Sequence, residues 1–227
     1  MSKHLALLSG KGGTGKTTLA ISLAAALHSI GEDTILIDAN LHTPHVGFSL
    51  GHGHHIDTVH DVLANRLAAV RSIVHRPDSF KYVPGDPHPK ELDLDHRRLK
   101  KFHGAADHVL YDGPPGDHRH VLAATDQVLI ITNPDLPSLV DANRIIAQAE
   151  QEQKIIAGVV VNKAAKHSLN QEQVERFLNT PIIAIIPYDE RFEHALHKRV
   201  PYYDLYPKRP PAAAIKELAG RLAGKPV

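Results

Sequence analysis

The chain has 227 residues, of which 42% are hydrophobic and 22% are charged, and its formal net charge at pH 7 is +1. This length and composition are typical of a soluble globular protein, and we expect residues 1–227 to form one domain. The absence of cysteine excludes disulfides, zinc–thiolate sites and cysteine-held iron–sulfur clusters. Without a signal-peptide pattern or an apolar run long enough to cross a bilayer, the sequence predicts a cytoplasmic protein.

Apolar segments of strand length alternate with segments of helical spacing. The first strand is expected over residues 4–9, and the helix after it begins near Lys16 and ends at Gly31. Further strands are expected over 33–38, 80–85, 107–112, 127–133, 154–162 and 181–187, and further helices over 138–150, 170–179 and 211–223. This order predicts an α/β fold with a doubly wound, mostly parallel sheet, helices on both faces, and ligands at the carboxyl ends of the strands.

A glycine-rich loop lies between the first strand and the first helix. Residues 10–17 read GKGGTGKT and match the P-loop pattern in the strand-to-helix context that it requires. In such a loop backbone N–H groups bind phosphate oxygens, Lys16 binds the β- and γ-phosphates, and the Thr17 hydroxyl ligates Mg²⁺. The predicted phosphate-binding residues are Gly12, Gly13, Thr14, Gly15, Lys16, Thr17 and Thr18. The pattern needs only one lysine and leaves Lys11 unexplained.

The loop and later motifs resemble the MinD/ParA family of P-loop ATPases, whose Walker A motif is deviant, and the MinD-like branch is the most similar. The resemblance covers nearly the whole chain and rests on KGGTGKT at 11–17 and on motifs at 36–51, 107–116, 127–145, 159–163 and 186–203. It implies a P-loop NTPase fold and an ATP-hydrolysing enzyme with ATP and Mg²⁺ as cofactors. It also implies that Lys11 reaches across an ATP-dependent homodimer to the phosphates of the other subunit.

Two carboxylates at strand ends complete the expected catalytic site. Asp38 and Asp112 are predicted to bind Mg²⁺ or its water together with Thr17, and Gly116 is expected to offer its N–H to the γ-phosphate. Relatives carry Asp-x-Asp where this chain reads Asp38-Ala39-Asn40. An amide can orient the attacking water but cannot act as a base, which predicts slow hydrolysis. The alternative is that Asn40 only caps the turn and another residue handles the water.

The residues after the strand at 154–162 bear on the choice of base. A guanine site of the NKxD type needs a carboxylate, and here Ala165 takes its place in Asn162-Lys163-Ala164-Ala165, which favours ATP over GTP. Asn162 and the turn at 187–189 resemble the family's adenine-contacting elements. The turn could equally be only a strand-to-helix connection. Its residues are Pro187, Tyr188 and Asp189.

Two surface features bear on partners. MinD proteins often end in a membrane-inserting basic helix, whereas residues 211–227 lack aromatic side chains and favour a helix packed through Ile215, Leu218 and Leu222. The run HRRLKKFH at 96–103 fits either a solvated helix face or contact with DNA or acidic lipid. A membrane or DNA surface, a peripheral membrane location and an activating partner protein of unknown identity therefore stay open.

The 18 histidines are unusual for this length. Imidazole binds zinc and nickel, so a rival hypothesis is a metal delivery NTPase that uses the His-rich segment GHGHHIDTVH at 51–60. The irregular spacing of the histidines, and their scatter through the chain, favour compositional bias instead. The histidines nearest to the expected phosphate site or within the segment are His42, His45, His52, His54, His55, His60, His118 and His120.

Overall fold

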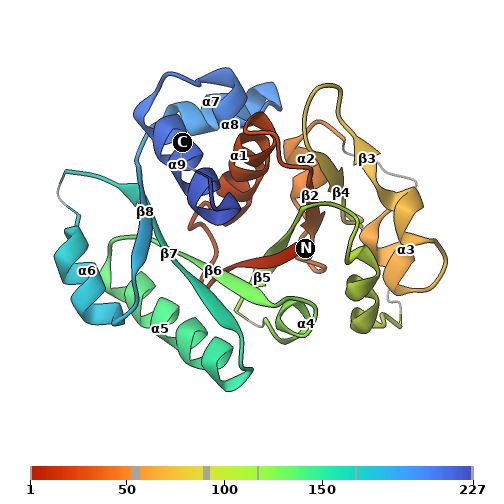
Figure 1. Ribbon diagram of the computed structural model, residues 1–227, viewed down its shortest axis with the longest axis horizontal. Helices are drawn as coiled ribbons and strands as arrows, with labels where there is room; N and C mark the ends of the chain where they lie inside the picture. The colour runs from red at the N-terminus through yellow and green to blue at the C-terminus, as the bar shows by residue number, and fades with distance from the viewer. Residues whose placement is uncertain (1, 53–56, 89–92, 117, 167, 226–227) are drawn as a thin grey trace.

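A single sheet forms the centre of the computed structural model, which describes residues 2–52, 57–88, 93–116, 118–166 and 168–225 (Figure 1). Its eight strands lie in the order β3-β4-β2-β5-β1-β6-β7-β8, and every pairing is parallel except that of β3 with β4. The strands are β1 (Lys3–Ser9), β2 (Thr34–Asp38), β3 (Val74–His75), β4 (Lys81–Val83), β5 (His108–Pro115), β6 (Gln127–Thr132), β7 (Ile155–Ala164) and β8 (Ile182–Pro187). The predicted α/β class with a mostly parallel sheet is confirmed.

Helices cover both faces of the sheet. The helical elements are α1 (Lys16–Ser29), α2 (Val46–Ser49), α3 (Val59–Leu63), α4 (Arg119–Leu122), α5 (Leu136–Gln151), α6 (Gln171–Leu178), α7 (Arg191–Lys198), α8 (Tyr202–Leu205) and α9 (Pro210–Ala223), with 3₁₀ helices η1 (Ala69–Ser72) and η2 (His96–Phe102). Figure 1 shows α1 and α9 on one face and α5 and α6 on the other. Two buried apolar clusters, one on each face, form the core.

The core follows from the apolar strands. The central strands β1, β2 and β5 are buried on both faces, as expected of parallel strands between helical layers. Helix α9 packs against α1 and β8, with Ile215 and Leu218 buried and Leu222 half-buried, which confirms the predicted packing of this helix. Within the described residues, no helix is both long and apolar enough to span a bilayer.

The predicted strands and the predicted helices α1, α5, α6 and α9 are confirmed, whereas β3, α2, α3, α4, α7 and α8 were not predicted. The two residues of β3 and the four or five residues of α2, α3, α4 and α8 are too few to show a hydrophobic period. The arrangement brings the carboxyl ends of β1, β2, β5 and β7 to one edge of the sheet, where α1 begins. A ligand site is expected at this edge.

Candidate nucleotide-binding site

The loop between β1 and α1 has the backbone geometry of a phosphate cradle. Gly13 and Gly15 have φ angles of +78° and +83°, a region that favours glycine. A Cβ atom on Gly10 would lie only 2.2 Å from the Cβ atom of Asp141 on α5, so this glycine permits close packing. The loop leads directly into the N-terminus of α1, whose partial positive charge favours an anion.

The two lysines of the loop point to different partners. Lys16 is 6% exposed, and its Nζ atom lies 2.5 Å from Oδ1 of Asp112, whose Oδ2 accepts a hydrogen bond from Thr17 Oγ1 at 2.6 Å. Lys11 is more exposed, and its Nζ atom lies 3.3 Å from Oδ1 of Asp135, the N-cap residue of α5. Lys16 therefore belongs to the buried site, whereas Lys11 lies at its open side.

Asp38 and Asp112 lie side by side in the register of β2 and β5. Asp38 is fully buried and accepts hydrogen bonds from the backbone N–H groups of Val46 (2.9 Å) and Asn40 (3.3 Å). Burial, and then the neighbouring Asp112 charge, raise the pKa of Asp38 to about 8, against the opposing effects of these N–H groups and of Lys16. The raised pKa marks a site at which a cation would be stabilising.

The predicted metal group of Thr17, Asp38 and Asp112 is brought together at this point. A hydroxyl and two carboxylates are hard oxygen donors of the kind that Mg²⁺ prefers. The contacts of Asp112 with Thr17 and Lys16 show that these side chains reach one another. Gly116 follows β5 in the left-handed backbone region, with φ +88°. Its contact with a γ-phosphate stays a prediction.

Asn40 lies beside this site, but its amide closes a turn. Its Nδ2 donates to the carbonyl oxygen of Thr43 at 2.7 Å and to Thr43 Oγ1 at 3.0 Å. Asn40 and Thr43 form one wall of a hollow of about 410 Å³, and the glycine-rich loop forms another wall. We call this space the phosphate hollow. Asn40 is thus close to the expected γ-phosphate, and its action on the attacking water stays a prediction.

A second cavity, of about 290 Å³, lies next to the glycine-rich loop. The end of β7 and the helix α7 form its other walls. Asn162 Nδ2 donates to the carbonyl oxygen of Thr14 at 2.7 Å, and Lys163 Nζ donates to that of Gly13 at 2.7 Å. The end of β7 thereby holds the glycine-rich loop. We call this space the base cavity, and its lining includes all the predicted base-contacting residues: Asn162, Pro187, Tyr188 and Asp189.

Asp189 has a structural network of its own. Its carboxylate accepts hydrogen bonds from Tyr202 Oη at 2.9 Å, Arg209 Nε at 3.2 Å and the backbone N–H of Arg191 at 3.0 Å. Burial alone would raise the pKa of Asp189, but these donors lower it to about 2. The carboxylate therefore connects α7, α8 and the start of α9. Because it is used in this way, only the backbone of the turn at 187–189 is available to contact a nucleotide base.

The histidines do not form a metal centre in the described part of the chain, where no three His, Cys, Asp or Glu side chains are grouped so that they could hold an ion. His52 hydrogen-bonds to Tyr82, and His60 and His120 bond to backbone carbonyl oxygens. His54 and His55 lie outside the described residues.

Sequence reasoning did not predict the contacts that three residues make beside the site: Asp135, His60 and Lys163. Asp135 had a local signal, because an Asp with a Pro two positions later is typical of a helix N-terminus. The contacts of Lys163 with the glycine-rich loop and of His60 with the loop after β2 join segments far apart in the chain, and no local pattern indicates them.

A glycine-rich loop at the N-terminus of α1, a buried lysine and two strand-end carboxylates define a P-loop nucleotide-binding protein. Residues 5–202 match the model of the CobQ/CobB/MinD/ParA nucleotide binding domain, and the chain belongs to this family. This confirms the resemblance seen in the motifs.

Individual relatives agree with this assignment. An uncharacterized ATP-binding protein of Methanocaldococcus jannaschii is 30% identical over 99% of this chain and 89% of its own length. The septum site-determining protein MinD of Pyrococcus horikoshii, solved with Mg-ADP, superposes with a TM-score of 0.90 at 25% identity, over 98% of this chain and 96% of that one. The MinC:MinD cell division protein complex of Aquifex aeolicus superposes with a TM-score of 0.89 at 27% identity, over 100% of this chain and 98% of that one.

Proposed function

We propose that the protein is an ATP-dependent dimerising switch ATPase that hydrolyses ATP to ADP and phosphate. The observation that carries the proposal is the position of Lys11, which is partly exposed beside the phosphate hollow while Lys16 occupies the buried site. A second lysine on the open side can neutralise phosphate charge bound by another copy of the chain. ATP with Mg²⁺ would close the dimer, and hydrolysis would open it.

The base cavity supports adenine as the base. Asn162 Nδ2 donates one hydrogen to the Thr14 carbonyl, so its second N–H and the amide oxygen are available to a base. The oxygen can accept from the amino group of adenine, and Ala165 provides no carboxylate of the kind that a guanine site of the NKxD type needs. The Pyrococcus relative with Mg-ADP supports the same choice of nucleotide and metal.

The cellular role that we propose is division site selection or the positioning of intracellular cargo. The MinC:MinD complex of Aquifex aeolicus supports a partner protein for this chain. We propose that such a partner recognises the ATP-bound dimer and accelerates hydrolysis. We propose that the protein works in the cytoplasm, with a peripheral position at a surface when dimeric.

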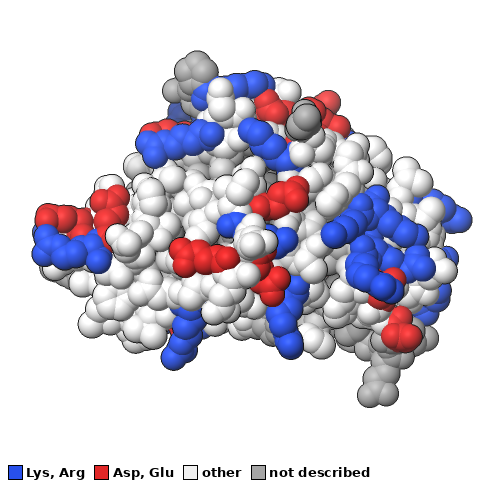
Figure 2. Space-filling model, turned by 60° about the horizontal axis from the view of Figure 1, so that its bottom comes forward, with Lys and Arg blue, Asp and Glu red and all other residues white. Residues whose placement is uncertain are grey.

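A patch of basic side chains is the best candidate for contact with that surface. Figure 2 shows Lys and Arg gathered on the side of the molecule that carries α3 and η2. In a 3₁₀ helix every third residue shares a face, and Leu99 and Phe102 of η2 are fully buried on one such face. The cations on the other faces of η2 line an open hollow with Asp95, and all of them are exposed except the half-buried Arg98. We call them the η2 patch: Arg97, Arg98, Lys100 and Lys101.

Light scattering with Mg-ATP, Mg-ADP and a non-hydrolysable ATP analogue tests the proposal. The switch model expects a dimer with ATP and its analogue and a monomer with ADP. A monomer under all three conditions would overturn the model. A pull-down from the source cell with analogue-bound protein would then search for the partner, with ADP-bound protein as the control.

A further inference from the structure

His60 connects two loops that lie at the carboxyl ends of β2 and β4. The residue belongs to α3 and is fully buried. Its Nε2 atom lies 2.9 Å from the carbonyl oxygen of Leu41, which follows β2. Its Nδ1 atom lies 3.0 Å from the backbone nitrogen of Asp86, which follows β4. One imidazole therefore holds two loops to a third element.

These two contacts determine where the ring carries its proton. A backbone N–H can only donate, so Nδ1 accepts from Asp86 and is unprotonated. A carbonyl oxygen can only accept, so Nε2 carries the proton and donates it to Leu41. Both contacts are satisfied only by the neutral Nε2–H tautomer, since an imidazolium would turn an N–H toward the N–H of Asp86.

The electrostatic surroundings favour this neutral form. Burial lowers the pKa of His60, and nearby His42 lowers it further. The hydrogen bond to Leu41 and the charges of Asp86 and Asp61 oppose the shift without reversing it. The ring is therefore neutral near pH 7, and acidification works against its contact with the loop after β4.

The loop that His60 holds carries the residues expected at the γ-phosphate. This loop runs over residues 39–45, directly after Asp38, and includes Asn40. It packs closely on the loop after β4, because a Cβ atom on Gly85 would lie 2.3 Å from Pro44 Cβ and 3.5 Å from Asp38 Cγ. A shift of either loop would therefore move Asp38 and the turn closed by Asn40.

We propose that His60 is a positioning residue for ATP hydrolysis, whose neutral ring fixes the loop after β2 and thereby the places of Asp38 and Asn40. This inference rests on the proposed ATPase function. The ring binds neither nucleotide nor metal, because both nitrogens are used by backbone groups. The glycine-rich loop is held separately by β7. Loss of the His60 contacts therefore slows hydrolysis and leaves nucleotide binding nearly unchanged.

Two variants, each of which keeps one of the two hydrogen bonds of the ring, provide the test. In His60→Gln the side-chain amide reaches as far as Nε2 and keeps a donor for Leu41, whereas in His60→Asn the shorter amide keeps an acceptor for Asp86. His75→Gln is the matched control, because His75 is exposed on β3. Single-turnover hydrolysis and the equilibrium binding of a fluorescent ATP analogue are measured from roughly pH 5.5 to 8. Thermal melts check that each variant is folded.

The expected results separate positioning from stability. His60→Asn should hydrolyse ATP about tenfold more slowly at pH 7.5, as expected for the loss of one hydrogen bond, with analogue affinity within about twofold of the parent. His60→Gln should retain more of the rate and lose the parent's decline on the acid side. Equal rates and pH profiles in parent and both variants would overturn the inference, as would a parallel loss of rate and affinity.

A readout independent of catalysis is the ¹⁵N spectrum of the imidazole in nucleotide-free protein. The Nε2–H tautomer is expected at pH 7.5, and the Nδ1–H tautomer would overturn the inference. A parent that binds or hydrolyses no ATP, while its spectrum shows the Nε2–H tautomer, would overturn the proposed function and the catalytic role of His60 but not the connection between the loops. The two failures are therefore distinguishable.

Discussion

The ammonium group of Lys11 lies 3.3 Å from the carboxylate of Asp135 in the same chain. Both side chains are partly exposed, so solvent screens the pair and its contribution is no more than about 1 kcal/mol. A contact of this strength is readily exchanged for a phosphate group. In the single chain Lys11 is therefore held only weakly by Asp135, and it can leave this contact when a second subunit binds.

Replacement of Lys11 tests the dimer directly. Lys11→Ala is expected to leave ATP binding largely intact, because Lys16 and the backbone of the glycine-rich loop still bind the phosphates, and to abolish ATP-induced dimerisation. Nucleotide titration and light scattering measure the two effects. A variant that dimerises like the parent would contradict the cross-subunit role.

Asp135→Asn is the complementary variant. Asparagine still caps α5 but no longer attracts the ammonium of Lys11. Dimerisation at limiting ATP should therefore become up to about 30-fold tighter, because each of the two subunits releases one exposed ion pair of at most about 1 kcal/mol. Weaker dimerisation in a variant with an unchanged melting temperature would show that Asp135 acts in the dimer itself.

Asn40→Asp addresses the departure from the family pattern. A carboxylate cannot donate to the Thr43 carbonyl as the Asn40 amide does, so the side chain is expected to turn toward the phosphate hollow. It should raise the single-turnover rate of hydrolysis without tightening ATP binding. If the rate is flat or lower while affinity and fold are unchanged, Asn40 serves the turn alone.

The elements that sequence predicts well are those with a strong local signal. The P-loop pattern located Lys16 and Thr17, and strand-end positions located Asp38 and Asp112, which the structure brings together. Parallel strands buried on both faces are continuous apolar runs, so their order along the chain and the doubly wound fold could be read directly.

The parts that sequence could not predict depend on contacts across the fold. His60 appeared as one histidine of a candidate metal cluster, and only the placement of the loops after β2 and β4 shows that it bonds to Leu41 and Asp86. Asp189 was predicted for its place beside the base, whereas its carboxylate is used by Tyr202 and Arg209.

Lys163 is expected to support nucleotide binding through the backbone of the glycine-rich loop. It adopts a left-handed conformation with φ +57°, which is unusual for a side-chain-bearing residue, and places its ammonium 2.7 Å from the Gly13 carbonyl oxygen. Lys163→Met should weaken ATP binding by about fivefold, since a hydrogen bond of this kind contributes about 1 kcal/mol. Calorimetric titration measures the effect, with exposed Lys166→Met as the control. Equal affinities in both variants would contradict the role.

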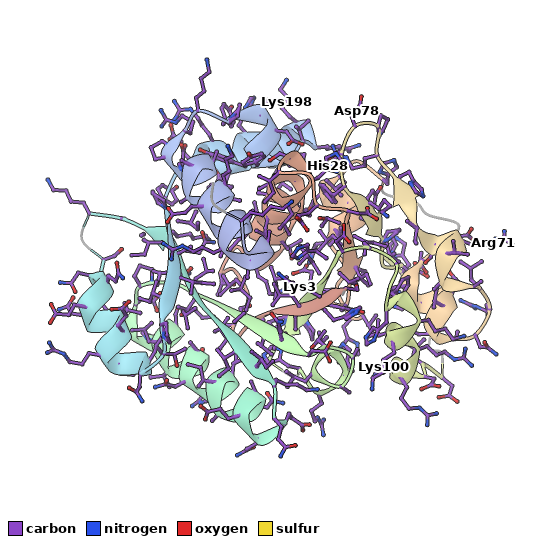
Figure 3. The ribbon with its side chains drawn as sticks, viewed as in Figure 1. Lys3, His28, Arg71, Asp78, Lys100 and Lys198 are labelled. Atoms are coloured by element: carbon purple, nitrogen blue, oxygen red, sulfur yellow. The ribbon has the colours of Figure 1, made fainter. Side chains whose placement is uncertain are left out.

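The η2 patch is expected to bind anionic surfaces in a salt-dependent manner. Replacement of Arg97, Lys100 and Lys101 by glutamine should weaken co-sedimentation with DNA or with acidic vesicles and lower its dependence on salt. Figure 3 shows Lys100 and Lys198 on opposite sides of the molecule. The matched control therefore neutralises the exposed residues Lys166, Lys198 and Lys208.

The comparison of ligands decides what the η2 patch binds. Loss of binding to DNA alone would indicate a nucleic-acid surface, and loss of binding to vesicles alone would indicate a membrane. Equal weakening in the patch variant and the control variant would show that only the overall charge matters. In that case the patch is a solvated helix face.

The carboxylate of Asp189 is expected to stabilise the fold in a pH-dependent way. Its pKa in the folded protein is about 2, below the value of about 3.9 for an unfolded aspartate. Above about pH 4 it is ionised in both states and its stabilising contribution is complete; as the pH falls from about 4 to 2, the unfolded state binds a proton first and the contribution is lost.

Replacement of this carboxylate should therefore lower the free energy of unfolding most at neutral pH. Asp189→Asn is expected to lower the free energy of unfolding by about 2–4 kcal/mol at pH 7, because Arg209 and Tyr202 lose a charged acceptor in a buried network. The difference from the parent should shrink as the pH falls from about 4 toward 2, because the unfolded parent binds a proton at Asp189 before the folded parent does. Urea denaturation at several pH values measures this difference in the free energy of unfolding.

The control is Asp78→Asn, on an exposed loop (Figure 3), which should change the free energy of unfolding little. A deficit that is constant with pH would show that Asp189 acts through its shape and not through its charge.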